Sequence, residues 1–452
     1  MFSKTRKFSP ARYILIVYFS MIAIGTLLLL LPISTTHSTS PINALFTSTS
    51  AFCVTGLIVK DTAIDFTLFG KIVILVLIQI GGLGYMSFSN FLLVLFRRRP
   101  NLQQISLAKE EYGLLTMEDV VGFLKSILIT AFVFEFVGVF LLFPGFLKVF
   151  PLKEALNQAV FHSISAFCNA GFSTISNNIS GFYKNPLVSL TIAFLVIVGG
   201  LGFFVIREIH LKIKGKHHFF STHSKLVFII TGILIIFSTA IIFGLEYNNV
   251  LWGKSLIHKL IISFFTAVTP RTAGFNVVTT SLLTPTTLLF LILAMYIGAS
   301  PGGTGGGIKT TTFGALLLWL KSKLLLREDV TVIKRRISTE TINKALLIFL
   351  LTLLVVVIST LLLTFTEKPV YNMRGLLPIL FEEVSAFGTV GLSMGSGHLS
   401  TLSLAADFSI WGKLIIIFTM IFGKAGPLMI AATIFKGREM DYRYPKAKIL
   451  IG

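Results

Sequence analysis

The hydrophobic positions of this chain fall into eight long apolar runs, separated by shorter and more polar stretches. Each run is long enough for a helix that crosses a bilayer, which needs about 20 mostly apolar residues. The pattern therefore predicts an all-α polytopic membrane protein. Its eight transmembrane helices are expected near residues 13–34, 72–96, 122–147, 186–206, 225–245, 286–320, 345–365 and 411–435.

Between the two runs of each successive pair lies a mixed stretch that ends in glycine. Its helical part is about 10–14 residues long, which suits a re-entrant segment better than a full crossing. These stretches are 42–57, 154–172, 253–275 and 374–392. We expect four repeats of helix, pore loop and helix with pseudo-fourfold symmetry around a central pore. They cover residues 13–97, 120–210, 222–325 and 344–436, and a cytoplasmic tail, 437–452, follows.

The re-entrant stretches also resemble one another in sequence. Ser50–Leu57 (SAFCVTGL) aligns with Ser165–Phe172 (SAFCNAGF) and with Ser385–Leu392 (SAFGTVGL), and Thr266–Phe275 is a looser copy. The apolar run after each stretch carries a second glycine motif, near Gly81, Gly199, Gly298 and Gly423. Each of the four pairs of apolar runs thus carries both glycine motifs, one in the re-entrant stretch and one in the run that follows. This repetition predicts four quasi-equivalent loops.

Four such loops around one axis can form a carbonyl selectivity filter, in which main-chain carbonyls replace the hydration shell of a cation. Glycine allows a positive φ at the turn, and the negative end of each short helix favours a cation. No carboxylate lies in these segments, so a ring of charged side chains is not indicated. The alternative is that the glycines only allow close helix packing. The expected filter residues are Val54, Thr55, Gly56, Asn169, Ala170, Gly171, Thr272, Ala273, Gly274, Thr389, Val390 and Gly391.

The composition is 54% hydrophobic and only 13% charged, which excludes an ordinary soluble enzyme, while the formal net charge is +20. Most of the 39 Lys and Arg residues lie on one side of the predicted spans, in clusters at the N-terminus and near 97–109, 207–225, 321–344 and 436–448. Because basic loops mark the cytoplasmic side, both termini are expected in the cytoplasm, and the chain in the plasma membrane among its lipids. The basic excess is then a topology signal, and a nucleic-acid partner is not implied.

Other chemistry is not indicated. The two cysteines, Cys53 and Cys168, form no disulfide or metal-binding pattern and are expected to pack as small apolar residues. His162 and the pair His217–His218 offer no metal geometry. Gly302–Lys309 resembles a phosphate-binding loop, but Ile308 separates the last glycine from the lysine. Nucleotide control would therefore have to come from another chain, and the protein is not expected to be an enzyme.

The fourfold pattern, with CVTGL at 53–57, PRTAGF at 270–275 and GTVGL at 388–392, resembles the Trk/Ktr/HKT superfamily of potassium transporters. The similarity covers about residues 13–436, and the chain is most similar to the Ktr-type membrane subunit because it lacks the extra N-terminal spans of Trk subunits. In that family, glycine rather than serine in the first filter accompanies potassium preference, and Gly56 fits. The resemblance implies a homodimer on a cytosolic, KtrA-like ring of nucleotide-binding regulatory subunits.

The resemblance also implies an intramembrane gate loop within 300–312, below the filter. Its expected residues are Gly302, Gly303, Thr304, Gly305, Gly306 and Gly307, and a plain helix break is the alternative. Lys424 stands where family members usually have Arg. Lysine keeps the charge but loses the five-donor fork, so a bidentate contact with the gate is in question. Alternatively, Lys424 extends toward an interface.

Four further ionisable residues lie near the repeats. Glu382 and Glu383 precede the fourth filter and are expected either to hydrogen-bond its backbone or to be solvated helix charges. Glu135 is an isolated acid in an apolar span, without a partner identifiable from sequence. Arg271 is expected to order the third loop rather than to touch the ion.

These observations together predict potassium uptake through a carbonyl filter, gated by the glycine-rich loop, with no cofactor in this chain. Potassium is the substrate, and sodium as a coupling or activating ion, as in a symporter, stays open. One alternative is a sodium or non-selective monovalent cation transporter on the same scaffold. The other is a membrane enzyme or receptor, for which paired acids or His clusters at midplane depth would be expected, and the sequence shows none.

Overall fold

The structure is a computed structural model that describes residues 10–84, 117–215, 219–397, 399, 401–426 and 430. In this part of the chain the fold is almost wholly helical, as expected, with one short antiparallel hairpin, β1 (Thr331–Val332) and β2 (Arg335–Arg336). The α-helices are α1 (Pro10–Leu30), α2 (Pro41–Phe52), α3 (Leu68–Leu83), α6 (Met117–Phe146), α7 (Leu152–Phe167), α8 (Pro186–Leu201), α9 (Phe203–Ile213), α10 (Thr222–Leu245), α11 (Leu256–Val268), α12 (Pro285–Tyr296), α13 (Thr310–Leu324), α14 (Thr339–Thr366), α15 (Lys368–Arg374), α16 (Leu376–Phe387) and α17 (Ile410–Ala425).

Local sequence explains many of the helix starts. Hydroxyl side chains of Thr67, Ser221, Thr284, Ser338 and Ser409 accept hydrogen bonds from the first turns of α3, α10, α12, α14 and α17. Such caps satisfy N–H groups that a helix leaves unpaired at its start. Proline stands at the beginning of α2, α8 and α12, where its missing N–H costs nothing.

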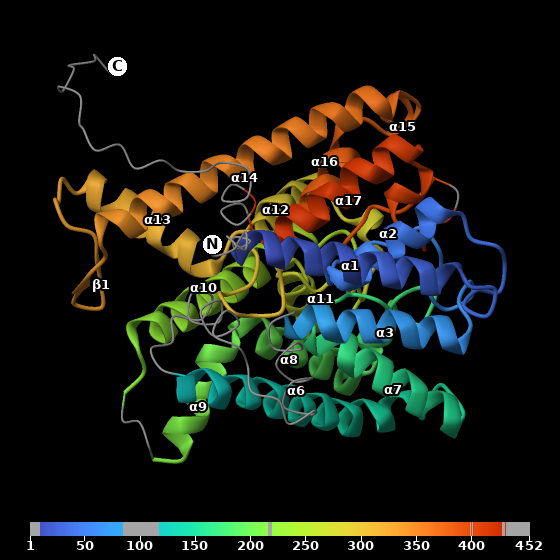
Figure 1. Cartoon of the computed structure of the whole chain (residues 1–452), viewed down its shortest axis with the longest axis horizontal. Coiled ribbons are helices and arrows are strands. Elements are labelled where there is room, and N and C mark those ends of the chain that lie inside the picture. The colour runs from blue at the N-terminus through green and yellow to red at the C-terminus, as the bar shows by residue number, and fades with distance from the viewer. Residues whose placement is uncertain are drawn as a thin grey trace, which may run out of the picture.

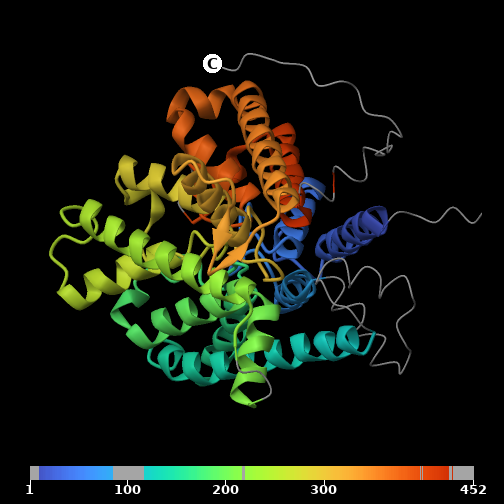
Figure 2. The ribbon, with the colours of Figure 1, turned by 90° about the vertical axis from the view of Figure 1, so that its left-hand side faces the viewer.

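The helices are arranged in chain order around a centre. Figure 2 shows α1–α3 in blue, α6–α8 in teal and green, α10–α12 in green and yellow, and α14–α17 in orange and red, in sequence around the molecule. Neighbouring groups meet through the contacts α3 with α7, α8 with α11, α12 with α16, and α17 with α2. The last of these joins the end of the described chain to its beginning.

Three helices are long and apolar enough to cross a membrane within the described residues: Lys125–Phe146, Thr222–Leu245 and Thr339–Thr366. Only 28% of the most apolar window of each is buried in the chain, so apolar side chains such as Phe136 and Phe140 face outward. An apolar outer surface of this kind is typical of a membrane protein. Figure 1 shows α14 running along one side of the molecule and α6 along the opposite side.

The prediction of a continuous helix over 186–206 is wrong. α8 ends at Leu201, and α9 leaves it at an angle of 98°. The bend lies at Gly202, whose φ of +94° only glycine adopts readily. Gly84 and Gly426 have nearly the same φ and ψ at the ends of α3 and α17. The expected span 186–206 is therefore broken. Residues 85–97 and 431–436, which belong to the expected first and fourth repeats, lie outside the described part.

Each long helix is tied at its end to the start of the next apolar helix of its repeat. Glu246, after α10, accepts hydrogen bonds from the Thr284 N–H and hydroxyl, both at 2.9 Å. Glu367, after α14, accepts from the Ser409 N–H at 2.9 Å and its hydroxyl at 2.6 Å. The Thr67 N–H donates to the Ser34 carbonyl at 3.1 Å and its hydroxyl to the Ile33 carbonyl at 2.5 Å, and the Asn185 side-chain amide donates to the Gly145 carbonyl at 3.2 Å. Different side chains thus make the same connection in all four places.

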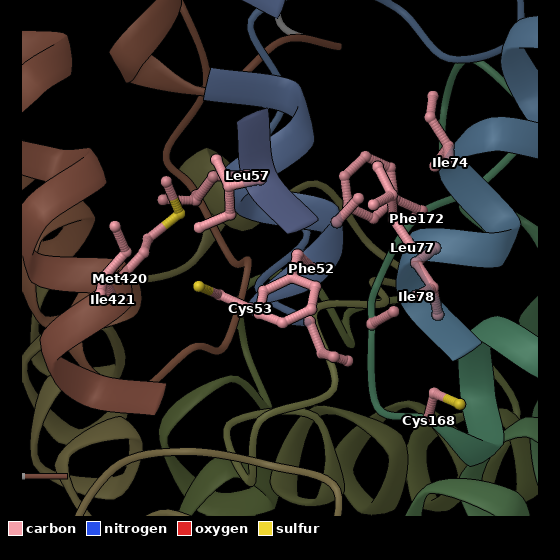
Figure 3. Packing of buried hydrophobic residues seen from close by; sticks show 14 of the residues in the cluster. Phe52, Cys53, Leu57, Ile74, Leu77, Ile78, Cys168, Phe172, Met420 and Ile421 are labelled. Atoms are coloured by element: carbon pink, nitrogen blue, oxygen red, sulfur yellow. The ribbon is translucent and has the colours of Figure 1, made fainter. Parts of the chain in front are cut away.

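The central core packs the short helices against the apolar helices that surround them. Figure 3 shows Phe52, Cys53 and Leu57 between Met420 and Ile421 of α17 and Leu77 and Ile78 of α3. Phe52, Cys53 and Leu57 are at most 1% exposed. Both cysteines are unpaired and buried, which agrees with their expected role as small apolar residues.

Candidate ion pathway

Four loop segments follow the short helices α2, α7, α11 and α16 and share an unusual backbone. In each, a non-glycine residue has a φ between +49° and +67°, and a glycine two positions later has a φ between +69° and +89°. Positive φ is unfavourable for β-branched residues, yet three of the four non-glycine positions are Val or Thr. Such strain persists only where the surroundings hold it and is typical of functional sites. The pairs are Val54 and Gly56, Asn169 and Gly171, Thr272 and Gly274, and Thr389 and Gly391.

The four glycines lie next to one another and close a ring. A Cβ atom on any of them would lie closer than 3.0 Å to the carbonyl oxygen of the residue before the next glycine in the ring. These contacts run from Gly56 to Ala170, from Gly171 to Ala273, from Gly274 to Val390, and from Gly391 back to Thr55. The structure therefore brings together the four predicted glycines and the predicted residues directly before them, with a main-chain carbonyl of each segment against the glycine of the preceding segment.

The second glycine motif, in the apolar helices that follow the loop segments, allows close packing of the backbone. A Cβ on Gly81, Gly199 or Gly423 would collide with the carbonyl oxygen of the last residue of a short helix, Phe52, Phe167 or Phe387 respectively. The packing interpretation of glycine thus applies to these positions. In the third repeat, Gly298 instead meets Gly306 of the glycine-rich loop.

Hydroxyl side chains of the short helices hold the loop segments. Ser50 donates to the Leu57 carbonyl at 2.8 Å and accepts from the Gly56 N–H at 3.1 Å. Ser165 donates to Phe172 at 2.7 Å, Ser385 accepts from the Gly391 N–H at 3.1 Å, and Thr269 donates to Phe275 at 2.5 Å. Sequence reasoning assigned these residues no role. Their signal was available, since a serine precedes three of the four glycines by six residues.

A polar cavity of about 310 Å³ opens on one side of the glycine ring. All four glycines line it, together with hydroxyl and amide residues that include Ser173, Asn178, Asn276 and Ser393. Asp61 is the one ionisable residue among the described residues that line it. We call this cavity the vestibule. Its polar lining suits a hydrated ion.

The glycine-rich loop lies on the other side of the ring. Thr389, whose backbone belongs to the fourth loop segment, accepts a hydrogen bond from the Gly306 N–H at 2.9 Å. A Cβ on Gly305 would collide with the Thr272 hydroxyl. The loop residues at 302–307 therefore pack directly against two filter segments.

The loop is also bound to the second repeat. The Ser300 N–H donates to the Gly200 carbonyl at 3.0 Å, the Thr304 N–H to the Gly199 carbonyl at 3.3 Å, and the Phe203 N–H to the Gly302 carbonyl at 3.0 Å. Lys309 donates back to the Gly305 carbonyl at 2.7 Å. The loop is thus held by α8 and α9 as well as by the fourth loop segment.

Lys424, at the end of α17, donates to the carbonyl oxygen of Thr304 at 2.5 Å. The side chain thus points toward the loop, not toward a membrane interface. This hydrogen bond to one carbonyl oxygen does not require the bidentate geometry of arginine.

Glu382 and Glu383 are both 0% exposed, so the interpretation as solvated helix charges is wrong. Glu382 accepts from the Ser393 hydroxyl at 2.6 Å and the Ala405 N–H at 3.0 Å, and it therefore anchors the polypeptide that follows the fourth loop. Glu383 faces the hydroxyls of Ser359 and Thr419, but within the described residues neither of its carboxylate oxygens has a hydrogen bond.

Glu135 has a partner that the sequence did not identify. Gln79, from the first repeat, donates to its carboxylate at 2.8 Å. Arg271 is buried and donates to the Thr231 hydroxyl of α10 at 3.3 Å, which agrees with a role in ordering the third loop. His162 contacts Ser173 at 2.9 Å beside the vestibule, and His217 and His218 lie outside the described residues. In those residues no three potential metal ligands come together.

Comparison with known proteins places this geometry in a family. Residues 3–441 match the family model of TrkH, described as a cation transport protein. The "Ktr system potassium uptake protein B" of Bacillus subtilis is 37% identical over 99% of this chain and 97% of its own length. The protein of the same name from Vibrio alginolyticus is 37% identical over 98% of this chain and 94% of its own length.

More distant similarities agree with this assignment. The "Potassium/sodium uptake protein NtpJ" of Enterococcus hirae is 32% identical over 99% of the chain and 98% of its own length. The solved structure of the potassium transporter TrkH from Vibrio parahaemolyticus has the same fold, with a TM-score of 0.76, 16% identity, and coverage of 96% of this chain and 87% of its own. This chain therefore belongs to the TrkH family of cation transport proteins, which are membrane transporters and not enzymes.

Proposed function

We propose that this chain is the potassium-translocating subunit of a Ktr-type uptake system in the plasma membrane. The observation that carries the proposal is the closed ring of four glycines, each against a carbonyl of the next segment. Carbonyls in such a ring can replace the hydration shell of a dehydrated cation. The names of the Bacillus and Vibrio relatives, which are potassium uptake proteins, support potassium as the ion.

In this proposal the chain forms eight membrane segments as four pseudo-symmetric repeats around the pore. The repeated α3–α7, α8–α11, α12–α16 and α17–α2 contacts support it, as do the four equivalent pairs of positive-φ residues. Ions enter from the vestibule, pass the filter and meet the loop below. Both termini then lie in the cytoplasm.

The loop at 302–307 is the proposed gate, and Lys424 is its latch. Four hydrogen bonds hold the loop to α8, α9, the fourth filter and α17, and Ser300, just before the loop, makes a fifth to α8. Each contributes about 1 kcal/mol, and a charged one somewhat more. A regulatory partner that changes these contacts by a few kcal/mol can therefore shift the balance between closed and open loops.

Partners follow from the same proposal. We expect a homodimer that binds a cytosolic ring of nucleotide-binding regulatory subunits of the KtrA kind. The hairpin between α13 and α14 projects from the helical body (Figure 1), and the hairpin together with the end of α13 that leads to it presents exposed cations such as Lys323, Arg327 and Arg335. It is a candidate docking surface. The second basic segment, 436–448, lies outside the described residues.

The test is uptake in cells that lack their own potassium systems, measured with micromolar to millimolar K⁺ in the presence and absence of Na⁺. We expect growth at low K⁺ in cells that express the chain. No rescue under any condition contradicts the proposal. A dependence of the rate on Na⁺ would add sodium as a coupling or activating ion.

A sodium or non-selective transporter is the second candidate, favoured by the potassium/sodium uptake named for the Enterococcus relative. The two candidates differ in the effect of Gly56→Ser. If the ring selects potassium, this variant loses discrimination between K⁺ and Na⁺, whereas an unselective pathway keeps the same ion preference.

A further inference from the structure

Asn178 occupies a special place at the outer edge of the glycine ring. It lines the vestibule and has a φ of +54°, a conformation that asparagine tolerates better than most residues. Its side-chain oxygen accepts from the Ile179 N–H at 2.9 Å and from the Asn276 N–H at 3.4 Å. Two main-chain donors on one atom fix which end of the amide is oxygen.

The amide nitrogen is therefore turned toward the filter. It lies 3.4 Å from the Gly171 carbonyl oxygen and 3.5 Å from that of Gly274. These are long, shared hydrogen bonds, which are individually weak. They nevertheless place the positive end of the amide dipole against the carbonyls of the second and third filter segments.

The other half of the ring differs. Within the described residues no side chain donates a hydrogen bond to the carbonyl oxygens of Gly56 or Gly391. The outermost carbonyls thus form two classes: a pair held by Asn178 and a pair open to the vestibule. Sequence repetition alone gives no sign of this difference.

We propose that Asn178 is a positioning residue that sets the affinity and selectivity of the outermost cation position in the pathway. This inference rests on the proposed function of the ring as a filter. By holding the Gly171 and Gly274 carbonyls, Asn178 leaves a dehydrated ion to be coordinated mainly from the Gly56 and Gly391 side. An entering ion consequently keeps part of its water there.

Removing the amide should release the two carbonyls. Additional carbonyl ligands favour the larger, more easily dehydrated K⁺ or Rb⁺ over Na⁺. For Asn178→Gly, which tolerates the positive φ, we expect a KM for Rb⁺ lower by about threefold and weaker competition by Na⁺. For Asn178→Asp, which also adds a charge, we expect a KM lower by about tenfold, because a nearby opposite charge stabilises the bound ion.

The experiment measures Rb⁺ uptake into proteoliposomes that contain the full chain with any regulatory subunits it requires. Initial rates over a range of Rb⁺, with and without competing Na⁺, give KM, maximal rate and Na⁺ inhibition separately. Asn177→Asp is the matched control, since Asn177 lines the same vestibule and, within the described part of the chain, its side chain donates no hydrogen bond to a filter carbonyl. It should act only as a screened surface charge, with an effect that disappears at high ionic strength.

The inference is overturned if Asn178→Gly leaves both KM and Na⁺ inhibition unchanged, or if Asn177→Asp reproduces the whole effect of Asn178→Asp. A variant with a lower maximal rate but unaltered KM and selectivity would show a purely structural role, which also contradicts it. Absence of uptake by the unaltered chain would be a different result, because it contradicts the proposed function itself.

Discussion

The filter segments and the glycine-rich loop are both breaks in helical structure, but they are held in different ways. Ser50 holds the first filter through residues only six and seven positions away. The loop is held across the fold, with 83 residues between Gly306 and Thr389 and 120 between Thr304 and Lys424. A hydrogen bond within one segment is kept when the packing between segments changes, whereas a hydrogen bond between distant segments is lost. This contrast supports the proposed roles of the filter segments in selection and of the loop in gating.

The largest expected effect comes from filling the glycine ring. In Gly391→Ala, the new Cβ would collide with the Thr55 carbonyl, and the φ of +89° is unfavourable for alanine. We expect Rb⁺ uptake to fall by at least about tenfold, a barrier change of about 1.4 kcal/mol or more. Gly232→Ala is the control, because the added Cβ in α10 would meet no side chain or neighbouring element within 4 Å among the described residues. Equal uptake by both variants would contradict the ring as the selecting element.

Release of the loop is the next largest effect. Lys424→Met removes the donor to Thr304, a charged hydrogen bond that contributes about 1.5–3 kcal/mol. We expect the open form to be favoured, and maximal Rb⁺ uptake to rise several-fold with little change in ion preference. Lys413→Met, at the other end of α17 where the lysine contacts Asn43 at 3.1 Å, should not raise it. A change in K⁺ over Na⁺ preference without a change in rate would place Lys424 in selection instead.

Removing a serine hydroxyl that holds a filter segment should change ion preference instead of the maximal rate. Ser50→Ala leaves the Leu57 carbonyl and Gly56 N–H without their buried partner, at a cost of about 1–3 kcal/mol. We expect a higher KM for Rb⁺ and weaker discrimination against Na⁺, measured by competition. Ser20→Ala removes an exposed hydroxyl that bonds only within α1 and should alter neither. If Ser50→Ala raised the maximal rate like Lys424→Met, the distinction between the two regions would be lost.

The smallest effect is expected at the connection between α10 and α12, which touches neither region. Burial raises the pKa of the Glu246 carboxyl, whereas hydrogen bonds from Thr287, Thr284 and Asn249 lower it. The hydrogen bonds together outweigh burial, so the pKa lies below its ordinary value. The ionised Glu246 carboxylate therefore stabilises the folded state. This stabilisation is fully present at pH values above the ordinary carboxyl pKa of about 4.3, and it is lost as the pH falls through the lowered pKa of the folded state. Glu246→Gln should lower the melting temperature slightly at pH 7.

The pH series provides the check on this last prediction. The difference in melting temperature between Glu246→Gln and the unaltered chain should shrink as the pH is lowered below about 4. Affinity, selectivity and maximal rate should stay the same at neutral pH. If the difference in melting temperature grows as the pH is lowered, the ionised carboxylate of Glu246 is not the form that stabilises the fold.

Much of the site could be predicted from repetition. The expected stretch 154–172 covers α7 except for its first two residues and includes the strained residues Asn169 and Gly171. A short apolar helix followed by glycine has few other possibilities in a membrane. The break in the helix within 186–206, in contrast, could not be predicted from the apolar pattern. An apolar run shows what is buried in lipid, but at the break Gly202 packs closely against Pro301, and the Phe203 N–H donates to the Gly302 carbonyl, about a hundred residues away.

Side-chain partners were the other limit. Glu382 and Glu383 are adjacent in sequence, yet one anchors a loop through Ser393 and Ala405 while the other faces Ser359 and Thr419. The partner of Glu135, Gln79, comes from another repeat. Such pairs depend on how repeats pack, and no local pattern encodes them.

The sequence by itself determined a helical membrane protein with four glycine-ended loops, because hydrophobic length and glycine spacing are local properties. Only the tertiary structure decided that Gly56, Gly171, Gly274 and Gly391 form one closed ring and that the loop at 302–307 lies against Thr389 and Lys424. It also decided that Asn178 divides the outer carbonyls into two classes. Repeats that are nearly equal in sequence become unequal where they pack against different neighbours.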